Sequence, residues 1–102
     1  MAIVYHITTA SAWKAAQERG HYEDPSLYTE GFIHLSEESQ VAGVLERYYS
    51  DQKGLVKVVV DTEKLTHPLR YELAPSVNEE FPHLYGPLNL DAVVEVEKLN
   101  DL

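Results

Sequence analysis

The chain of 102 residues has no cysteine, and it has only five glycines and one methionine. The absence of cysteine excludes disulfide bonds, thiol catalysis and thiolate-bound metal ions. It also fits a reducing compartment, and we expect a cytoplasmic protein. No apolar run approaches the roughly 20 residues that a membrane-spanning helix needs. Residues 1–5 lack the basic region of a signal peptide. We therefore expect no association with a membrane.

Basic residues are also scarce, with 8 Lys and Arg against 17 Asp and Glu and a net charge of -9. The basic side chains are scattered, without a run or a stripe. Duplex nucleic acid is bound through neutralisation of its phosphates, so this composition argues against such a partner. A small-molecule ligand stays compatible, because one helix N-terminus or one Arg can hold a small anion.

Hydrophobic residues make up 44% of the chain, as in ordinary globular domains, so we expect a single domain over residues 1–102. Periodicity and turn residues predict strands at 3–8, 30–36, 55–61, 69–73, 81–88 and 92–99, and helices at 9–20 and 37–49. Two main helices and about six strands indicate an α+β fold with a mostly antiparallel, split β-sheet.

Several segments carry finer expectations. The continuous β-branched run at 55–61 favours a central strand, whereas Pro82 and Pro87 predict an edge strand or a bulge at 81–88. Ser36 is expected to be the N-cap of the second helix. The stretch 21–29 is expected to be a loop containing a short helical turn.

Two predicted strands place histidine and a hydroxyl residue in alternation. In the second strand His34 and Ser36 share a face with Phe32, and in the first strand His6 and Thr8 share a face. Imidazole offers one hydrogen-bond donor and one acceptor, so the two strands predict two walls of a polar site. The alternative is that each histidine is a satisfied, half-buried structural residue.

The octet at 81–88 combines rigid prolines with His83, Tyr85 and Gly86. It predicts either a preformed wall that stacks against a flat ring or a kinked strand with aromatic core residues. A metal site built from His6, His34 and His83 with a carboxylate such as Glu72 is a third alternative. No two histidines stand at a metal-ligand spacing on one element, and no Gly-rich phosphate loop or nucleophile elbow is present.

The chain resembles the DUF952 family, a bacterial family of about 100 residues and unknown function. The resemblance rests on Tyr5-His6-Ile7-Thr8, on Gly31-Phe32-Ile33-His34 and on the segment from Phe81 to Leu88. It covers essentially the whole chain.

More distantly, that family is similar to the ADP-ribosyltransferase fold, whose cleft grips NAD. This resemblance implies that His6 and Thr8 hold a ribose and that His34 contacts the transferred group. A late catalytic Glu would correspond to Glu72 in this chain. Binding residues would be His6, Thr8, Ser36, His83 and Tyr85, and the catalytic pair would be His34 and Glu72.

Two hypotheses follow. The first is a domain that binds NAD or an ADP-ribosyl-like nucleotide in a His-lined cleft, with transferase-type chemistry, as a monomer or weak dimer. The second is a non-catalytic binding or interaction domain. Convergence of His6, His34 and His83 in one open cleft would favour the first hypothesis.

Overall fold

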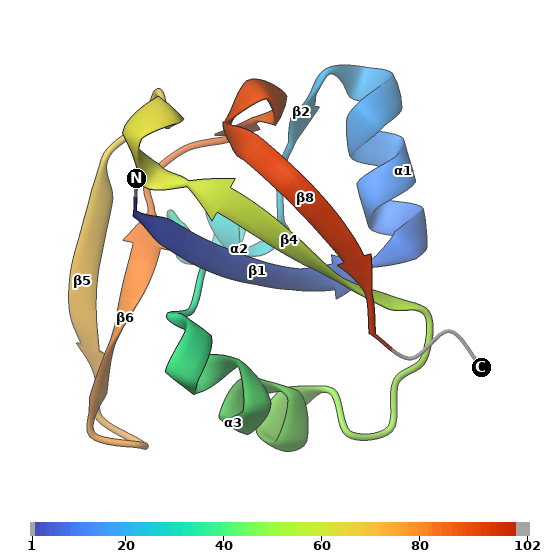
Figure 1. Ribbon diagram of the computed structural model, residues 1–102. Coiled ribbons are helices and arrows are strands. Elements are labelled where there is room, and N and C mark those ends of the chain that lie inside the picture. Colours follow the sequence, from blue (N-terminus) through green and yellow to red (C-terminus); the bar gives the residue numbers. More distant parts are fainter. Residues whose placement is uncertain (1, 100–102) are drawn as a thin grey trace.

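The computed structural model describes residues 2–99 as an α+β arrangement with three helices and mostly antiparallel strands (Figure 1). The strands are β1 Ile3–Thr9, β2 His21–Tyr22, β3 Ile33–His34, β4 Leu55–Asp61, β5 Leu69–Ala74, β6 Glu79–Leu84, β7 Leu88–Asn89 and β8 Val93–Lys98. The helices are α1 Ala10–Arg19, α2 Ser26–Thr29 and α3 Glu38–Tyr48, with two 3₁₀ turns, η1 Thr62–Lys64 and η2 Leu90–Ala92.

The strands form three small antiparallel sheets, ordered β1-β4-β8, β2-β7 and β3-β6-β5. In Figure 1 the β5–β6 hairpin stands at one end of the β1-β4-β8 sheet, α3 lies beside β1, and α1 lies toward the other end. Tyr5 and Ser36 join two of the sheets through a pair of backbone hydrogen bonds of 2.8 Å. The expected sheet is therefore split, and β1 meets the end of β3 at the split.

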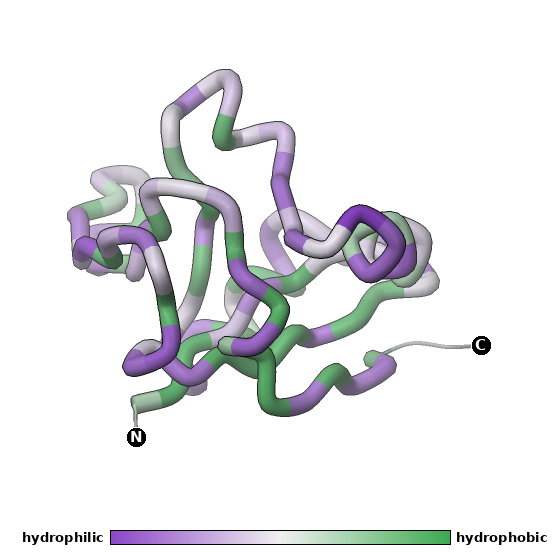
Figure 2. The backbone as a smooth tube through the Cα atoms, turned by 90° about the horizontal axis from the view of Figure 1, so that it is seen from above, coloured by the Kyte–Doolittle hydropathy of each residue, from purple (hydrophilic) through white to green (hydrophobic). Residues whose placement is uncertain are grey.

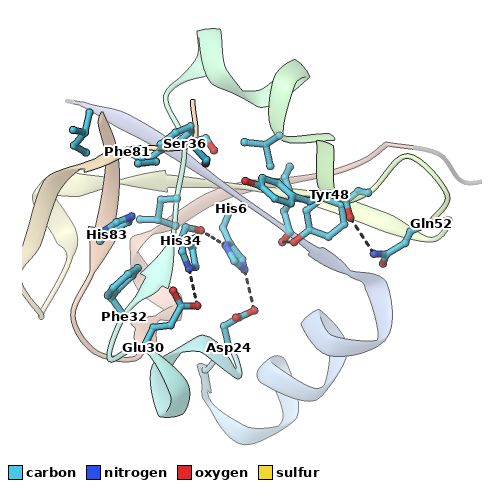
Figure 3. A pocket seen from close by; sticks show the side chains of 17 residues that line it. His6, Asp24, Glu30, Phe32, His34, Ser36, Tyr48, Gln52, Phe81 and His83 are labelled. Carbon is cyan, nitrogen blue, oxygen red and sulfur yellow. Dashed lines mark hydrogen bonds and ion pairs between the residues drawn. The ribbon is translucent and has the colours of Figure 1, made fainter. Parts of the chain in front are cut away.

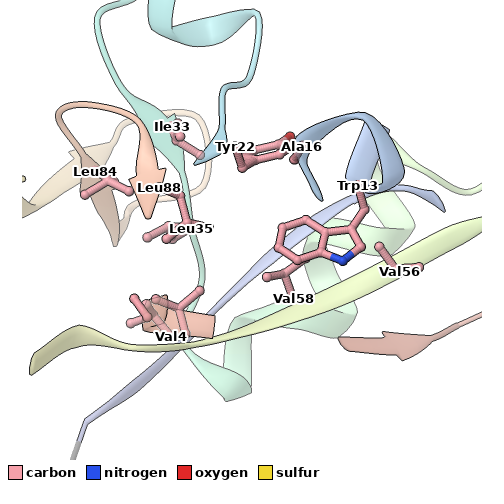
Figure 4. Close-up of a cluster of buried hydrophobic side chains, with 12 residues drawn as sticks. Val4, Trp13, Ala16, Tyr22, Ile33, Leu35, Val56, Val58, Leu84 and Leu88 are labelled. Carbon is pink, nitrogen blue, oxygen red and sulfur yellow. The ribbon is translucent and has the colours of Figure 1, made fainter. Parts of the chain in front are cut away.

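One hydrophobic core connects these sheets (Figure 4). Trp13 and Ala16 of α1 pack with Val58 of β4, and Ile33 and Leu35 join the same cluster from β3 and the residues after it. The radius of gyration is 12.8 Å, close to the ~13 Å of a compact domain of 100 residues. Figure 2 shows hydrophobic and hydrophilic segments alternating along much of the tube, together with longer hydrophobic runs.

Several elements confirm the predictions from the sequence. The strand β4 has the predicted bounds and lies between β1 and β8, where its β-branched residues are covered on both sides. In α1 the side chain of Thr9 accepts a hydrogen bond from the backbone N–H of Ala12 (3.0 Å), and Gly20 ends the helix at φ 100°. The loop expected at 21–29 does contain a short helix, α2, and also the two-residue strand β2.

Two predictions are wrong. Ser36 does not cap α3, because Glu37 is the N-cap and forms a capping box with Gln40. The segment containing Pro82 is not an edge strand, because β6 lies between β3 and β5. The carbonyl of Pro82 accepts the N–H of Leu35 (2.9 Å), which lies beyond the two paired residues of β3. The missing N–H of Pro82 therefore falls where the β3 ladder has already ended.

Residues 2–99 contain no helix that is long and apolar enough to cross a membrane.

Candidate functional site

An open cleft of about 710 Å³ lies where the two larger sheets separate, between β1, β3, β6 and α3 (Figure 3). Its lining is formed by His6, Ile7, Asp24, Glu30, Phe32, His34, Leu35, Ser36, Val44, Tyr48, Tyr49, Gln52, Leu73, Ala74, Ser76, Phe81 and His83. Ligand-binding clefts have volumes of about 300–1,000 Å³, so a small organic molecule fits this space.

The structure brings together four of the candidate site residues in this lining, namely His6, His34, Ser36 and His83. Thr8, Glu72 and Tyr85 do not line the cleft. Glu72 forms a hydrogen bond with His83 of the lining, and the ring of Tyr85 contacts that of Phe32 of the lining. Thr8 forms a hydrogen bond with Tyr22. The three strand histidines therefore converge on one cleft.

His6 lines the cleft but is only 4% exposed, and a buried hydrogen-bond network holds its ring. Its Nδ1 lies 2.7 Å from the carbonyl oxygen of His34 and donates to it, while its Nε2 lies 2.8 Å from the Tyr22 hydroxyl. The Tyr22 hydroxyl also lies 2.8 Å from Oδ1 of Asp24 and 3.1 Å from Oγ1 of Thr8. Both ring nitrogens of His6 are thus engaged by the protein, and His6 acts by positioning the other groups of the wall.

The protons of this network can be counted. Tyr22 has one hydroxyl proton, and both His6 Nε2 and the Asp24 carboxylate lie within hydrogen-bond distance of its oxygen. The hydroxyl of Tyr22 donates to Asp24, so His6, Tyr22 and Asp24 form one continuous hydrogen-bonded chain.

The two acidic groups of the network have shifted pKa values. The pKa of Asp24 is held well below its usual range, chiefly by its interaction with the nearby His6 ring, against the opposing effect of burial, and with help from the N–H of Ser26 and the hydroxyl of Tyr22. Burial raises the pKa of Tyr22 far above its usual value. Asp24 is therefore a carboxylate and Tyr22 a neutral phenol at neutral pH.

His83 is held in place by Glu72 from behind the cleft. Its Nδ1 donates to Oε1 of Glu72 at 2.7 Å, and the Tyr85 hydroxyl donates to the same oxygen at 2.5 Å. The hydrogen bonds from Tyr85 and then His83 lower the pKa of Glu72. The ring of His83 stacks on Phe32, with centroids 3.9 Å apart and planes at 14°.

The other ring nitrogen of His83 is free for a ligand. Among residues 2–99, Nε2 of His83 has no hydrogen-bond partner. Every fully buried side-chain nitrogen or oxygen in this part of the chain does have a partner, so Nε2 is not fully buried and reaches solvent. The Glu72 contact places the proton of a neutral ring on Nδ1. In that tautomer the lone pair is on Nε2 of His83, a residue of the cleft lining.

His34 and Ser36 complete this wall. Nε2 of His34 lies 3.1 Å from Glu30, and its ring meets Phe32 edge-on at 4.9 Å. Ser36 is only 5% exposed, and within the described part of the chain its hydroxyl has no hydrogen-bond partner. The hydroxyl of Ser36 therefore remains available to a molecule in the cleft.

The histidines do not form a metal centre. Within residues 2–99 no group of three or more His, Cys, Asp or Glu side chains could hold a metal ion. Both ring nitrogens of His6 form hydrogen bonds within the protein, and Nδ1 of His83 forms one with Glu72. The alternative of a metal site at His6, His34 and His83 thus lacks the ligand geometry that a metal requires.

Sequence reasoning missed several residues of the site. Asp24 and Tyr22 lie in the stretch expected to be a loop, and Tyr49 is the last residue of the helix expected at 37–49. In the structure Asp24 and Tyr49 line the cleft, and Tyr22 links Asp24 to His6. The alternation of the second strand did carry a signal for Phe32, which shares a face with His34. No local pattern marks Asp24, because its role depends on a contact with β1.

Comparison with known proteins gives a family and related structures without an activity. The model of a family described as "Protein of unknown function (DUF952)" matches residues 7–96. No curated protein matches the chain significantly. Neither result links the chain to the ADP-ribosyltransferase fold.

The solved structures that match are of protein CC0527 from Caulobacter crescentus. Its crystal structure is 31% identical, with a TM-score of 0.88, and the match covers 97% of this chain and 87% of that chain. Its solution NMR structure is 32% identical, with a TM-score of 0.83, and covers 98% and 86% respectively. The fold described above is therefore shared with an experimentally determined relative.

Proposed function

The chain belongs to the DUF952 family, whose function is unknown, and we propose that it binds NAD or an ADP-ribosyl-like nucleotide in the cleft. The observation that carries this proposal is the ring of His83, which lines the cleft, is oriented by Glu72 and keeps Nε2 without a partner among residues 2–99. A nucleotide supplies the two features that this wall suits, namely a flat ring and ribose hydroxyls.

The walls of the cleft support each part of such a ligand. Phe32, Phe81 and Tyr49 provide aromatic faces for a planar ring. Ser36 and His34 provide a hydroxyl and an imidazole nitrogen for ribose or amide groups. The cleft is open and about 710 Å³ in volume, which suits one nucleoside unit with the rest of a dinucleotide extending outward.

His83 gives this site a proton acceptor. An imidazole whose Nδ1–H is fixed by a carboxylate and whose Nε2 faces the ligand is the arrangement used for general base catalysis. We assign to His83 the acceptance of a proton from a ligand hydroxyl or from water, and to Glu72 its orientation. Transferase-type chemistry would begin with this proton transfer, with His34 next to the transferred group.

The other candidate residues act through the wall. His6 and Thr8 meet at the Tyr22 hydroxyl and fix Asp24, and Tyr85 shares the Glu72 oxygen with His83. They are positioning residues, and we expect their substitution to affect ligand affinity through the shape of the cleft.

The substitution His83→Phe tests the proposal, because it keeps a flat ring against Phe32 and removes both nitrogens. We expect the wild-type domain to bind NAD by calorimetry and the variant to bind at least about tenfold more weakly, a loss of about 1.4 kcal/mol. His21→Phe is the matched control, since His21 pairs with Glu23 outside the cleft lining. Equal NAD affinity in His83→Phe and wild type would contradict the assignment of His83.

A second candidate function, a non-catalytic interaction domain, is favoured by apolar side chains on two edge strands. Leu73 of β5 is 54% exposed and Val94 of β8 is 45% exposed, and both strands end their sheets. Open strand edges can pair with another chain. Sedimentation velocity tests this alternative: self-association that is abolished by Val94→Lys and insensitive to NAD would favour it over the nucleotide cleft.

A further inference from the structure

The charges around the cleft are unusual for a nucleotide site. Asp24 and Glu30 are both in the lining, and among the described residues the lining contains no Lys or Arg. Arg47 is the neighbour of the lining residue Tyr48 in the sequence, and its guanidinium carbon lies 5.7 Å from the centroid of the Tyr48 ring. Arg47 itself is outside the lining. Phosphates are normally held by such basic groups or by a helix N-terminus.

The histidines do not compensate for this lack of basic residues, because each one already faces a carboxylate. His6 Nε2 lies 3.7 Å from Asp24, His34 Nε2 lies 3.1 Å from Glu30, and His83 Nδ1 lies 2.7 Å from Glu72. Any positive charge on these rings is therefore matched by a negative one. An incoming anion would meet no unmatched cation in the cleft and would also face the field of a chain with net charge -9.

A cation meets the opposite situation. The carboxylate of Asp24 reaches the cleft with 26% of its side chain exposed, and Tyr49 and Phe81 offer aromatic faces on other parts of the wall. Ring faces and carboxylates together attract organic cations. Glu30 adds a second carboxylate to the same lining.

Two polar groups of the wall point to a ligand independently of the acids. Ser36 is 5% exposed and His83 is 7% exposed, and within residues 2–99 neither the Ser36 hydroxyl nor Nε2 of His83 has a protein partner. Because no fully buried side-chain nitrogen or oxygen among these residues lacks a partner, both atoms reach solvent. Each can accept a hydrogen bond from an N–H or O–H donor, so an amide or ribose group carried by a ring can take the place of water there.

From these observations we infer that the cleft selects a positively charged planar ring, of the pyridinium type, over a phosphorylated anion. The inference rests on the proposed function and narrows it, because the pyridinium nucleoside end of a dinucleotide would enter the cleft and the phosphates would stay in solvent. The recognised ligand is then a ring cation with an amide or hydroxyl substituent.

A matched pair of small probes tests the inference: 1-methylnicotinamide, a cation, and nicotinamide, its neutral counterpart. Both are titrated into the wild-type domain by NMR at low and high salt, and ADP-ribose serves as the anionic probe. We expect 1-methylnicotinamide to bind at least about tenfold more tightly than nicotinamide. This exceeds the ~0.8 kcal/mol, about fourfold, that a methyl group contributes by burial alone. The preference should shrink at high salt and in Asp24→Asn.

The outcomes separate this inference from the proposed function. Binding of ADP-ribose at least as tight as that of 1-methylnicotinamide would overturn the inference and keep the nucleotide cleft. Preference for 1-methylnicotinamide with no binding of NAD would support a cation cleft and overturn the nucleotide proposal. No shift with any probe would overturn both. Because the wild-type domain alone distinguishes these results, a folding defect in Asp24→Asn would not change which of them holds.

Discussion

The hydroxyl of Tyr22 connects three side chains that the sequence separates widely: His6, Thr8 and Asp24. Tyr22 is 1% exposed, so removing its hydroxyl leaves buried polar atoms without their partner. We expect Tyr22→Phe to lower the free energy of unfolding by about 1–3 kcal/mol in urea denaturation. The control is Tyr28→Phe, whose ring is 77% exposed and whose hydroxyl bonds to Glu23 at the surface. Equal losses in the two variants would contradict the role of the Tyr22 hydroxyl.

Asp24 makes the same network sensitive to acid. Its pKa is lowered in the folded protein, so the unfolded chain takes up a proton first as the pH falls below the ordinary value of 3.8. The stabilisation is complete above that value and is lost as the pH falls toward the lower folded pKa. We expect the melting temperature of Asp24→Asn to depend less steeply on pH than that of wild type between about pH 5 and 2.

An exposed turn carboxylate provides the comparison for this measurement. Asp51→Asn changes the same charge away from the network and should leave the wild-type slope nearly intact. A wild-type slope in Asp24→Asn would show that the carboxylate of Asp24 is not selectively stabilised by folding.

At the scale of single residues, the sequence predicted which histidines lie near the cleft. It did not predict the contacts that each of them makes there. Alternation singled out His6, His34 and Ser36, and all three line the cleft, although Ser36 lies beyond the end of β3, which is shorter than the strand predicted at 30–36. It could not show that the two ring nitrogens of His6 form hydrogen bonds with the carbonyl of His34 and the hydroxyl of Tyr22. Those contacts join segments that are distant in the sequence and depend on the tertiary fold. The role of Glu72 likewise depends on strand register between β5 and β6.

At the scale of elements, the turn after β6 depends on Gly86. Its φ of +153° is rarely adopted by other residues, and a Cβ built there would lie 2.4 Å from Cγ and Cδ2 of His67. We expect Gly86→Ala to destabilise the protein by about 1–3 kcal/mol in chemical denaturation.

A double-mutant cycle separates the two causes. His67→Ala should recover part of the loss in Gly86→Ala, since it removes the clashing ring but not the backbone strain. Gly54→Ala is the control for strain alone, because φ is +70° there and nothing lies within 4 Å of the built Cβ. Full additivity of Gly86→Ala and His67→Ala would rule out the steric contact as a cause.

Predictions of elements succeeded where local signals agreed. A continuous β-branched run defined β4, and a threonine N-cap with a glycine stop defined α1. The two-residue strands β2 and β7 were missed, because their pairing joins segments that are far apart in the chain and lack any strand-like pattern. The proline rule misplaced β6, because it could not foresee that β3 stops after His34.

At the scale of the whole molecule, the core and the cleft wall differ in packing. The strand β4 contributes Val56, Val58 and Val60 to the core, whereas α3 has no buried residue and lends Val44 and Tyr48 to the cleft. We expect backbone amides in the second half of α3 to exchange hydrogen at least about tenfold faster than those of β4. Bound ligand should slow exchange in α3 specifically. Equal protection of α3 and β4 in the free protein would contradict this division.

The fold class and the family could be predicted from the sequence, whereas a more distant relationship to another fold could not. Composition and element count indicated an α+β fold with a split sheet, and three motif segments indicated the family, which the match over residues 7–96 confirms. The relation to ADP-ribosyltransferases, which the comparisons do not show, rested on the short pattern around His6, with His34 and Glu72 as looser matches. A histidine followed by a hydroxyl residue is common in strands, so it carries too little information to define a fold.

The most direct test of the central claim, that the cleft is a small-molecule site, is an NMR titration of the isotope-labelled domain with NAD. We predict saturable shifts confined to the cleft, at the amides of His34, Ser36 and Tyr49 and at the imidazole of His83, with His21 and His67 unchanged. Resonances that all stay in place at millimolar NAD, or shifts that map to β8 instead, would contradict it.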